Sequence, residues 1–383
     1  MNLEVAFALL GGFNLGIIIM NIPPVLSELM SLYGASYTQI SVLMSAQLWP
    51  HAVMQLPAGM IVDRLGVRRT HCLSLVCMCI GSAVPAIGPA LSWGIGGRML
   101  TGVGTGLAWL AALKMLAIVA PGGRAGAYQA FFAGAFSIGS IVAYLVLPVI
   151  VEVGWRWVFL TPAILCLPQL ALVPILRPAP RSLPGSLLPF RRIVAMHSAW
   201  ILGIYHAMSY GAMLTIGNWI PSLLAEVSSH RTATQFAWGG ALVMFVSGLA
   251  RLLGGVIIFR VSPLAVAHGC ILVLCGLFAA LAFTHAPGAV LGLAILVAWF
   301  GSMNFGSLFQ LVSRSAAAGS LGSVLGFVNL LGNFGAVVFT LMFGWSKDML
   351  GSFAWGFAAL SPLAVAVLVA GLRVLGKSGP LHN

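Results

Sequence analysis

An arginine lies well inside one of the most apolar stretches of this chain. Arg251 stands between Val246-Ser247-Gly248-Leu249-Ala250 and Leu252-Leu253-Gly254-Gly255-Val256. A guanidinium in the middle of a membrane helix costs about 2.5–3.5 kcal/mol on insertion scales, so such a residue is a functional-site candidate by default. Its planar, permanently charged fork of donors suits a small oxyanion, inorganic or carboxylate. The alternative is an arginine that only packs helices together or reaches the interface, which from here is roughly 10 Å away.

A second polar group occurs early in the chain. Gln55 can donate two hydrogen bonds to an anion without carrying a charge. His51 precedes it by four residues and therefore shares its helix face. His51 is either a neutral residue packed beside Trp49 and Pro50, or a group whose protonation supplies a positive charge and links anion uptake to protons. His206 is a second candidate for proton coupling.

The composition predicts a membrane protein made of helices. Of 383 residues, 60% are hydrophobic and 6% are charged. Apolar runs of about 20 residues, each long enough to cross the hydrocarbon layer, recur throughout, and the alternation typical of a β-barrel is missing. The first run has no basic stretch before it and no small-residue cleavage site after it, so we interpret it as a retained helix. The twelve predicted spans are 5–27, 38–62, 70–90, 93–118, 125–150, 157–175, 198–224, 234–258, 263–283, 288–311, 319–343 and 353–374.

A proline-rich basic segment divides the spans into two sets of six. It begins at Arg177-Pro178-Ala179-Pro180-Arg181 and is too polar to insert. We therefore expect an N-terminal bundle over 1–176, a cytoplasmic linker over 177–197 and a C-terminal bundle over 198–383. The two sets also repeat, since Gln55 to Arg64 aligns with Arg251 to Arg260 and places Gln55 opposite Arg251. Halves related in this way hold a substrate site between them near the middle of the membrane.

The distribution of basic residues predicts the orientation. If both termini are cytoplasmic, twelve of the eighteen Lys and Arg residues fall in cytoplasmic segments, three fall outside and three lie within spans. This asymmetry accounts for most of the formal charge of +12 without a nucleic-acid partner. With no organellar targeting segment, we expect an integral protein of a bacterial inner membrane.

Two motifs resemble those of the major facilitator superfamily. Gly59-Met60-Ile61-Val62-Asp63-Arg64-Leu65-Gly66-Val67-Arg68-Arg69 resembles the superfamily's GxxxDRxGxRR loop, and Arg98-Met99-Leu100-Thr101-Gly102-Val103-Gly104 resembles its fourth-helix RxxxGxG motif. The resemblance implies an all-α membrane protein with twelve transmembrane helices in two pseudo-symmetric halves. It also implies a gating role for Asp63 with Arg64, Arg68 and Arg69. Arg98 either joins them by bracing the central cavity or extends to the interface.

A narrower resemblance is to the nitrate/nitrite porter family. Leu249-Ala250-Arg251-Leu252-Leu253-Gly254-Gly255 is similar to that family's LARxxGG segment, whose arginine contacts the anion. Asn304 begins a segment similar to its tenth-helix NGxxF motif, and Gly326 to Gly335 resembles its glycine-rich signature. Within that signature, Asn329 and Asn333 share one face and are candidates for addressing the anion. In the first half the pattern departs, because Gln55 stands where these porters have a second arginine and Ser137 where they have an asparagine.

The remaining residues exclude several classes of function. All six acidic residues stand at span ends or in loops, so none is placed to relay protons in the way of a drug exporter. Gly102-Val103-Gly104-Thr105-Gly106 lies inside a span and lacks the lysine of a nucleotide-binding loop. The six cysteines lack metal-ligand spacing. We therefore expect no enzymatic activity, no cofactor, no metal, and no nucleic-acid or obligate protein partner besides the lipid bilayer and a small anionic solute.

The leading hypothesis is a secondary transporter of a small anion that works by alternating access, as an exchanger or a proton symporter. Arg251 would bind the anion, and Gln55 and Asn333 would supply neutral donors, with Asn329, Asn304 and Ser137 as further candidates. One alternative is a drug or metabolite exporter of the same superfamily. Another is a transport-inactive membrane sensor or partner-binding component.

Overall fold

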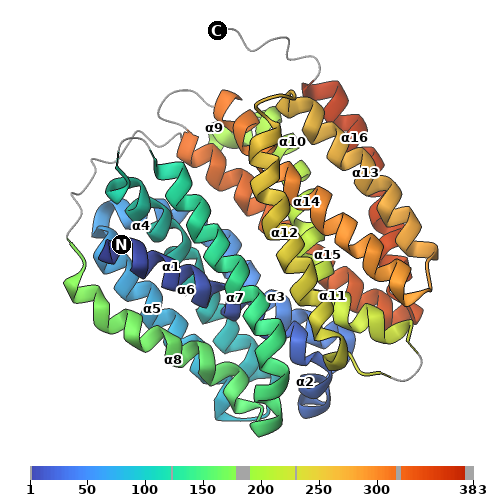
Figure 1. Ribbon diagram of the computed structural model, residues 1–383, viewed down its shortest axis with the longest axis horizontal. Coiled ribbons are helices and arrows are strands. Elements are labelled where there is room, and N and C mark those ends of the chain that lie inside the picture. Colours follow the sequence, from blue (N-terminus) through green and yellow to red (C-terminus); the bar gives the residue numbers. More distant parts are fainter. Residues whose placement is uncertain (1, 122–123, 178–189, 229–230, 316–320, 376–383) are drawn as a thin grey trace.

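The computed structural model describes residues 2–121, 124–177, 190–228, 231–315 and 321–375, and all regular elements in these ranges are helical (Figure 1). Most of the predicted linker, residues 178–189, lies outside the described residues. The linker boundaries at 177 and 197 therefore stay predictions.

The helices of the first half account for six spans. The first span comprises α1 (Leu3–Ile19), η1 (Pro23–Val25) and α2 (Leu26–Tyr33), and the others are α3 (Tyr37–Met54) with α4 (Pro57–Leu65), α5 (Val67–Ala83) with η2 (Val84–Ile87), α6 (Leu91–Val119), α7 (Ala125–Val153), and α8 (Arg156–Leu172) with η3 (Val173–Ile175).

The second half follows the same plan. After the short helix α9 (Phe190–Val194), its spans are α10 (His197–His206), η4 (Ala207–Gly211) and α11 (Ala212–Glu226) in succession, η5 (Thr234–Phe236) with α12 (Ala237–Ile257), α13 (Pro263–Phe283), α14 (Pro287–Ser315), α15 (Leu321–Leu350) and α16 (Ala354–Leu375).

Ten of these spans, within the described residues, are long and apolar enough to cross a membrane. The other two, one in each half, each contain an irregular turn. The second span breaks at Gln55-Leu56 because Pro57 has no N–H and its ring excludes a regular helix turn before it. The seventh span contains one turn of π-helix, Ala207–Gly211, between α10 and α11. Both breaks fall near predicted site residues, and π-turns are frequent at functional sites.

Each half is held together by close helix crossings. In the first half α1 packs on α7, and α5 packs on α6 and α8. In the second half α12 packs on α14, and α13 packs on α14 and α16. The halves meet along two seams, α3 against α15 and α7 against α12. Helices α3 and α15 come from opposite ends of the sequence, whereas α7 and α12 lie on either side of its middle (Figure 1).

Glycines at equivalent positions permit the closest of these crossings. A Cβ on Gly139 of α7 would lie 1.9 Å from the carbonyl oxygen of Phe13 on α1. A Cβ on Gly335 of α15 would lie 2.5 Å from the Cβ of Ala207 at the π-turn. Any side chain at either site would push the helices apart. Gly139 in the first half and Gly335 in the second half thus have the same packing role.

Candidate functional site

Arg251 lies on α12, which borders the seam between the halves. Small residues one turn on either side bring α12 against α14: Ser247 Oγ is 2.7 Å from Ser302 Oγ, and a Cβ on Gly254 would lie 2.2 Å from the carbonyl oxygen of Met303. This close crossing fixes the position of the arginine between them. Its Nε atom is buried and has no hydrogen-bond partner among the described residues.

Two aromatic rings contact the guanidinium instead. Arg251 Cζ lies 5.8 Å from the ring centre of Tyr210 and 5.4 Å from that of Phe305. Behind them, His206 stacks on Tyr210 with ring centres 5.2 Å apart, and Phe309 stacks on Phe305 at 4.2 Å. The rings attract the cation but use few of its donors, since they accept no N–H in the guanidinium plane. The rings stabilise the positive charge of Arg251, and the Nε–H, unpaired among the described residues, remains available to donate to a planar anion.

The π-turn positions Tyr210, and Asn304 secures the turn. Asn304 is fully buried on α14 and donates from Nδ2 to Ser209 Oγ at 2.7 Å. Its other amide atom, Oδ1, accepts from Ser307 Oγ at 2.7 Å. Both ends of the Asn304 amide therefore bond to protein. In this structure Asn304 supports the residue next to Tyr210, so it acts on the site through Ser209 rather than by a free donor.

Helix α15 brings the predicted asparagines to the same region. Asn333 donates from Nδ2 to the carbonyl of Asn329 at 2.9 Å, and its Oδ1 is buried without a partner among the described residues. Between them, Gly332 lies so close to His206 that an added Cβ would sit 2.1 Å from the imidazole Cδ2. The glycine-rich segment therefore lets His206 pack directly against the α15 backbone.

The first half contributes a chain of neutral hydrogen-bonding groups. Gln55 Nε2 lies 3.1 Å from His51 Nε2, and His51 Nδ1 lies 3.1 Å from Thr105 Oγ1 on α6. Thr105 Oγ1 also lies 3.1 Å from the Gly102 carbonyl oxygen, to which it donates. Gln55 and His51 are 4% and 5% exposed, and Gln55 Oε1 has no partner among the described residues.

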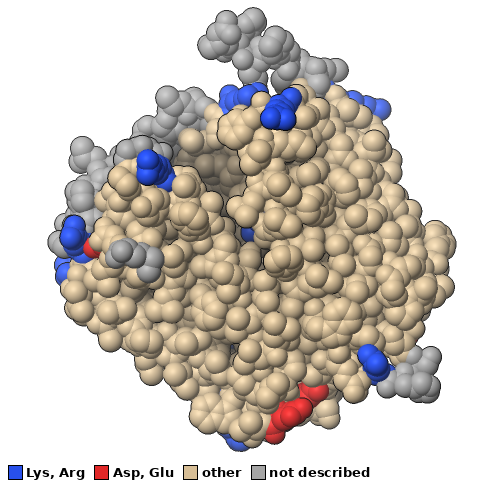
Figure 2. Space-filling model, viewed as in Figure 1, with Lys and Arg blue, Asp and Glu red and all other residues tan. Residues whose placement is uncertain are grey.

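The two sides of the site have neighbours in common. On α15, Gly326 approaches Gln55, with its added Cβ 3.0 Å from the Gln55 carbonyl oxygen, while Gly332, six residues further on, contacts His206. Ser137 on α7 lies 3.2 Å from the Cβ position of Gly248, one turn before Arg251. The structure thus brings Ser137 to the second half's arginine helix, as the sequence repeat requires. Figure 2 shows a hollow in the seam between the halves and a basic side chain within that seam.

The predicted gating residues are divided between two places. Arg64, Arg68 and Arg69 are exposed, whereas Asp63 forms an ion pair with Lys114 of α6. This ion pair joins α4, which follows the break at Pro57, to α6.

Arg98 is used entirely within the first half. It is 4% exposed and donates to Leu43 O at 2.9 Å, Asn21 Oδ1 at 2.6 Å and Met44 O at 3.4 Å. These bonds tie α6 to α3 and to the end of α1. Of the two alternatives for Arg98, the structure favours the brace over extension to the interface.

Hydrogen bonds that join the halves gather at the end opposite the linker. Asp348, in the last turn of α15, accepts from the backbone N–H of Tyr37 at 3.1 Å and of Thr38 at 2.7 Å. It thereby caps the N-terminus of α3 in the other half. Further towards the centre, Tyr144 donates to Gly217 O at 2.6 Å. The described residues are closed at this end and hollowed towards the other.

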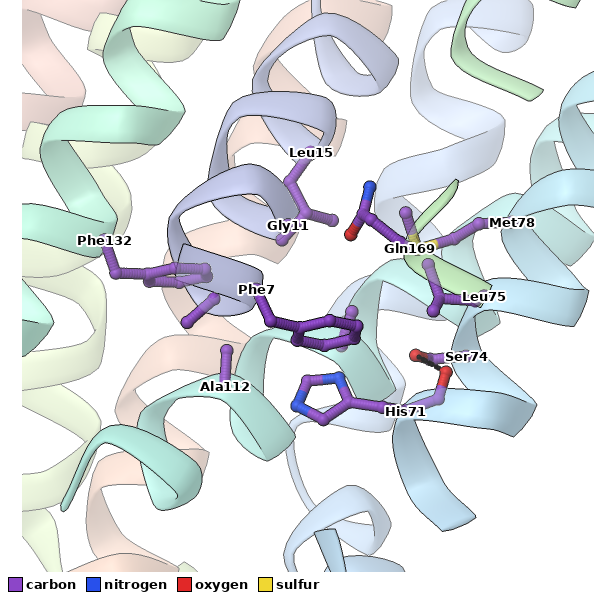
Figure 3. Close-up of a pocket in the computed structure, with 12 residues that line it drawn as sticks. Phe7, Gly11, Leu15, His71, Ser74, Leu75, Met78, Ala112, Phe132 and Gln169 are labelled. Atoms are coloured by element: carbon purple, nitrogen blue, oxygen red, sulfur yellow. Dashed lines mark hydrogen bonds between the residues drawn. The ribbon is translucent and has the colours of Figure 1, made fainter. Parts of the chain in front are cut away.

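A separate small pocket lies inside the first half (Figure 3). It is enclosed by α1, α5, α6, α7 and α8 and has a volume of about 10 Å³, enough for about one water molecule. His71 borders it, and its Nε2 is buried without a partner among the described residues. The pocket is too small for a solute, and its lining includes none of the predicted site residues.

Sequence reasoning missed four residues that shape the site or its closure: Thr105, Tyr210, Phe305 and Asp348. Tyr210 lies close in sequence to the predicted His206. Thr105 could have been found from the glycine pattern of α6, because Gly102 and Gly106 let α3 approach. Phe305 follows the predicted Asn304 directly. The pairing of Asp348 with α3 has no local signal, because its partners lie more than 300 residues away.

Comparison with known proteins agrees with this geometry. The family model of the Major Facilitator Superfamily matches residues 8–340. The chain belongs to this superfamily, and it is an integral membrane transporter of small solutes.

Three relatives show how the similarity is distributed. The "Nitrite extrusion protein" of Bacillus subtilis is 24% identical over 374 residues, which cover 95% of this chain and 91% of the relative. The "Probable nitrate/nitrite transporter NarK2" of Mycobacterium tuberculosis is 26% identical over 331 residues, covering 82% and 81%. The "Azole resistance protein 1" of Saccharomyces cerevisiae is 31% identical over 143 residues, but these cover only 37% of this chain and 23% of the relative.

Proposed function

We propose that this protein is a secondary transporter that moves a small inorganic oxyanion or small carboxylate by alternating access. The observation that carries the proposal is Arg251, a half-buried cation in the seam between the halves. Its Nε is buried without a hydrogen-bond partner, and the side chain has no carboxylate partner among the described residues. An unpaired buried charge is costly unless a ligand completes it. An anion that accepts from the guanidinium supplies the missing charge and the missing acceptors.

The relatives that cover most of the chain support this substrate class. Their names concern nitrite and nitrate, which are small, planar and monovalent. The flanking rings of Tyr210 and Phe305 are compatible with a flat anion lying against the guanidinium. In this proposal Arg251 provides the charge, while Gln55 and Asn333 provide neutral donors from the first half and from α15.

The basic residues support an orientation with the linker and both termini in the cytoplasm. With this orientation, the end closed by Asp348 faces outward and the hollow faces the cytoplasm, so the structure corresponds to an inward-open state. Asp63 and its neighbouring arginines then stand at the cytoplasmic gate. In a bacterial cell the membrane would be the inner membrane.

The exporter alternative is less well supported. Its match to the azole resistance protein covers about a third of the chain. All six acidic residues are described, and each lies at or near a helix end, where five of them bond to other parts of the protein. A carboxylate in the middle of the bundle, as expected for proton-driven export of cations, does not occur among them.

The test is anion-dependent stabilisation of the purified protein, followed by flux in proteoliposomes. We expect nitrate, nitrite or a small carboxylate such as formate to raise the unfolding temperature of the wild type and to leave that of Arg251→Ala unchanged. Counterflow of the same anion would establish transport. If an anion stabilises the protein but no flux occurs under any gradient, the sensor alternative takes the place of the transporter. If no anion stabilises it, the proposal fails.

A further inference from the structure

The hydrogen bonds around His51 define which nitrogen carries its proton. Gln55 Nε2 is an amide donor and faces His51 Nε2, so this ring nitrogen accepts. His51 Nδ1 then carries the proton and donates to Thr105 Oγ1. The Thr105 hydroxyl in turn donates a hydrogen bond to the Gly102 carbonyl. Every group in this chain is neutral. Gln55 Nε2 also donates to the His51 carbonyl at 3.4 Å, so Gln55 Oε1 is the atom of the chain that lacks a partner among the described residues.

Protonation of His51 would reverse one contact in this chain. A proton taken from water onto Nε2 turns that nitrogen into a donor, which then faces the donor Nε2 of Gln55 at 3.1 Å. The conflict is removed when the amide of Gln55 rotates by half a turn, because its Oε1 then accepts from the imidazolium. That oxygen is free to do so, since it has no partner among the described residues. The bond from His51 Nδ1 to Thr105 is kept throughout, and the rotation gives up the bond of 3.4 Å from Gln55 Nε2 to the His51 carbonyl.

The same rotation changes what Gln55 offers to the seam. Before rotation, the buried amide group without a partner is an acceptor, which repels an anion. After rotation, the unpartnered group is the NH₂, which donates to an anion. The change requires no movement of the helix backbone.

We propose that Gln55 is the residue through which protonation of His51 controls anion binding, by turning its amide from an acceptor into a donor. This inference rests on the proposed function, and it makes His51 a positioning residue that touches Gln55 rather than the anion. It predicts that anion binding is accompanied by proton uptake, and that the preferred ligands are anions with acceptors only, such as nitrate.

The elements packed on α3 carry other charged and titratable groups. The elements that pack on α3 and its continuation are α2, α4, α5, α6 and α15. Arg98 bonds to Asn21 and Asp63 to Lys114, whereas Tyr33 Oη and His71 Nε2 are buried without a partner among the described residues. Arg251 on α12 is the charge across the seam. The residues on the packed elements are Glu28, Tyr33, Asp63, Arg64, Arg68, Arg69, His71, Cys72, Cys77, Cys79, Arg98, Lys114, Lys347 and Asp348.

The experiment measures nitrate affinity of the purified full-length protein between about pH 5.5 and pH 8. For the wild type we expect affinity to fall by roughly tenfold as pH rises, the equivalent of one hydrogen bond to a charged ligand. Gln55→Met keeps the size of the side chain and leaves His51 in place, but it removes the rotating amide. We expect its affinity to be independent of pH and equal to that of the wild type at high pH. His51→Gln should also be independent of pH.

A matched control is available on the same helix. Gln47 lies two turns before Gln55, is fully buried, and has no hydrogen-bond partner for either amide atom among the described residues. Gln47→Met should retain the pH dependence of the wild type. Unfolding temperatures without nitrate show whether each variant is folded.

Distinct outcomes overturn distinct claims. If Gln55→Met keeps the pH dependence while His51→Gln loses it, His51 acts directly through its charge, and the proposed relay from His51 to the anion through the Gln55 amide is wrong. If both variants keep it, another group such as His206 carries the proton. A wild type that binds nitrate equally at all pH values removes the relay and leaves the proposed function intact. A wild type that binds no anion at any pH removes the proposed function itself.

Discussion

The second half contributes a permanent charge with open donors to the site, whereas the first half contributes neutral groups bonded to one another. Arg251 contacts the faces of Tyr210 and Phe305, and its Nε has no hydrogen-bond partner among the described residues. Gln55 and His51, at the aligned position of the first half, form a chain that ends on Thr105. A pair of arginines would both attract the anion by charge, whereas here only one of the two aligned residues carries a charge. In the proposed mechanism, Arg251 of the second half attracts the anion at every pH, and Gln55 of the first half supplies a contact that changes with pH.

The largest expected effect removes the charged side of this comparison. Arg251→Ala should weaken anion binding by about 100-fold, or about 3 kcal/mol, as for truncating one partner of a buried charge pair. Arg251→Lys keeps the charge but loses the planar fork, so its anion affinity should lie between that of the wild type and that of Arg251→Ala. The shift of unfolding temperature with anion concentration measures both. Equal shifts in wild type and Arg251→Ala would contradict the assignment of this residue.

A second variant makes the two halves alike. Gln55→Arg places a second cation at the aligned position, and at an effective dielectric constant near 20 this should tighten anion binding by roughly tenfold. Binding should also lose its dependence on pH, because the amide of Gln55 is gone. Anion titrations at two pH values test this, with Gln55→Met as the uncharged control. Unchanged affinity would mean that position 55 is remote from the anion.

A smaller effect is expected from the aromatic wall of the second half. Tyr210→Leu removes one cation–π contact, worth about 0.5–1.5 kcal/mol, and should weaken anion binding about threefold to tenfold. Tyr210→Phe keeps the ring and should stay within about twofold of the wild type. Comparing the two variants in the same titration separates the ring from its hydroxyl. A large loss in Tyr210→Phe would show that the hydroxyl itself binds the anion.

The smallest effect on binding is expected at Asn304. Asn304→Leu leaves Ser209 and Ser307 without their amide partner, which should lower the free energy of unfolding by about 1–2 kcal/mol. Anion affinity should change by only about twofold, since Asn304 acts through the π-turn. Ser307→Ala, which removes only one of the two bonds, serves as the milder control. A strong loss of affinity in a stable Asn304→Leu protein would restore the prediction that Asn304 binds the anion directly.

The sequence predicted the architecture well because membrane crossing imposes a strong pattern. Apolar runs, the basic loops and the repeat between Gln55 and Arg251 together define twelve spans, and membership of the superfamily is confirmed. The interruption of the second span before Pro57 could have been read from the proline. The π-turn at Ala207–Gly211 could not, because no residue in it forbids a regular helix.

The sequence indicated individual candidate residues of the site, but it did not predict their hydrogen-bond partners. Arg251 is conspicuous because of its charge, and Gln55 because of its alignment with Arg251. The partners of Asn304 and Arg98 depend on distant helices, so no local pattern predicts that Asn304 bonds to Ser209 or that Arg98 bonds to Asn21. The roles proposed for Gln55, Asn329, Asn333, Ser137, His51 and His206 stay predictions.

The Asp348 carboxylate that closes the end opposite the linker has a consequence for the idle protein. Its two bonds to Tyr37 and Thr38 link the halves without any contribution from the substrate. When the halves part at that end, the carboxylate and the first turn of α3 must both be rehydrated. For the proposed transporter, this implies that an empty molecule rests with that end shut, which would limit uncoupled leakage across the membrane.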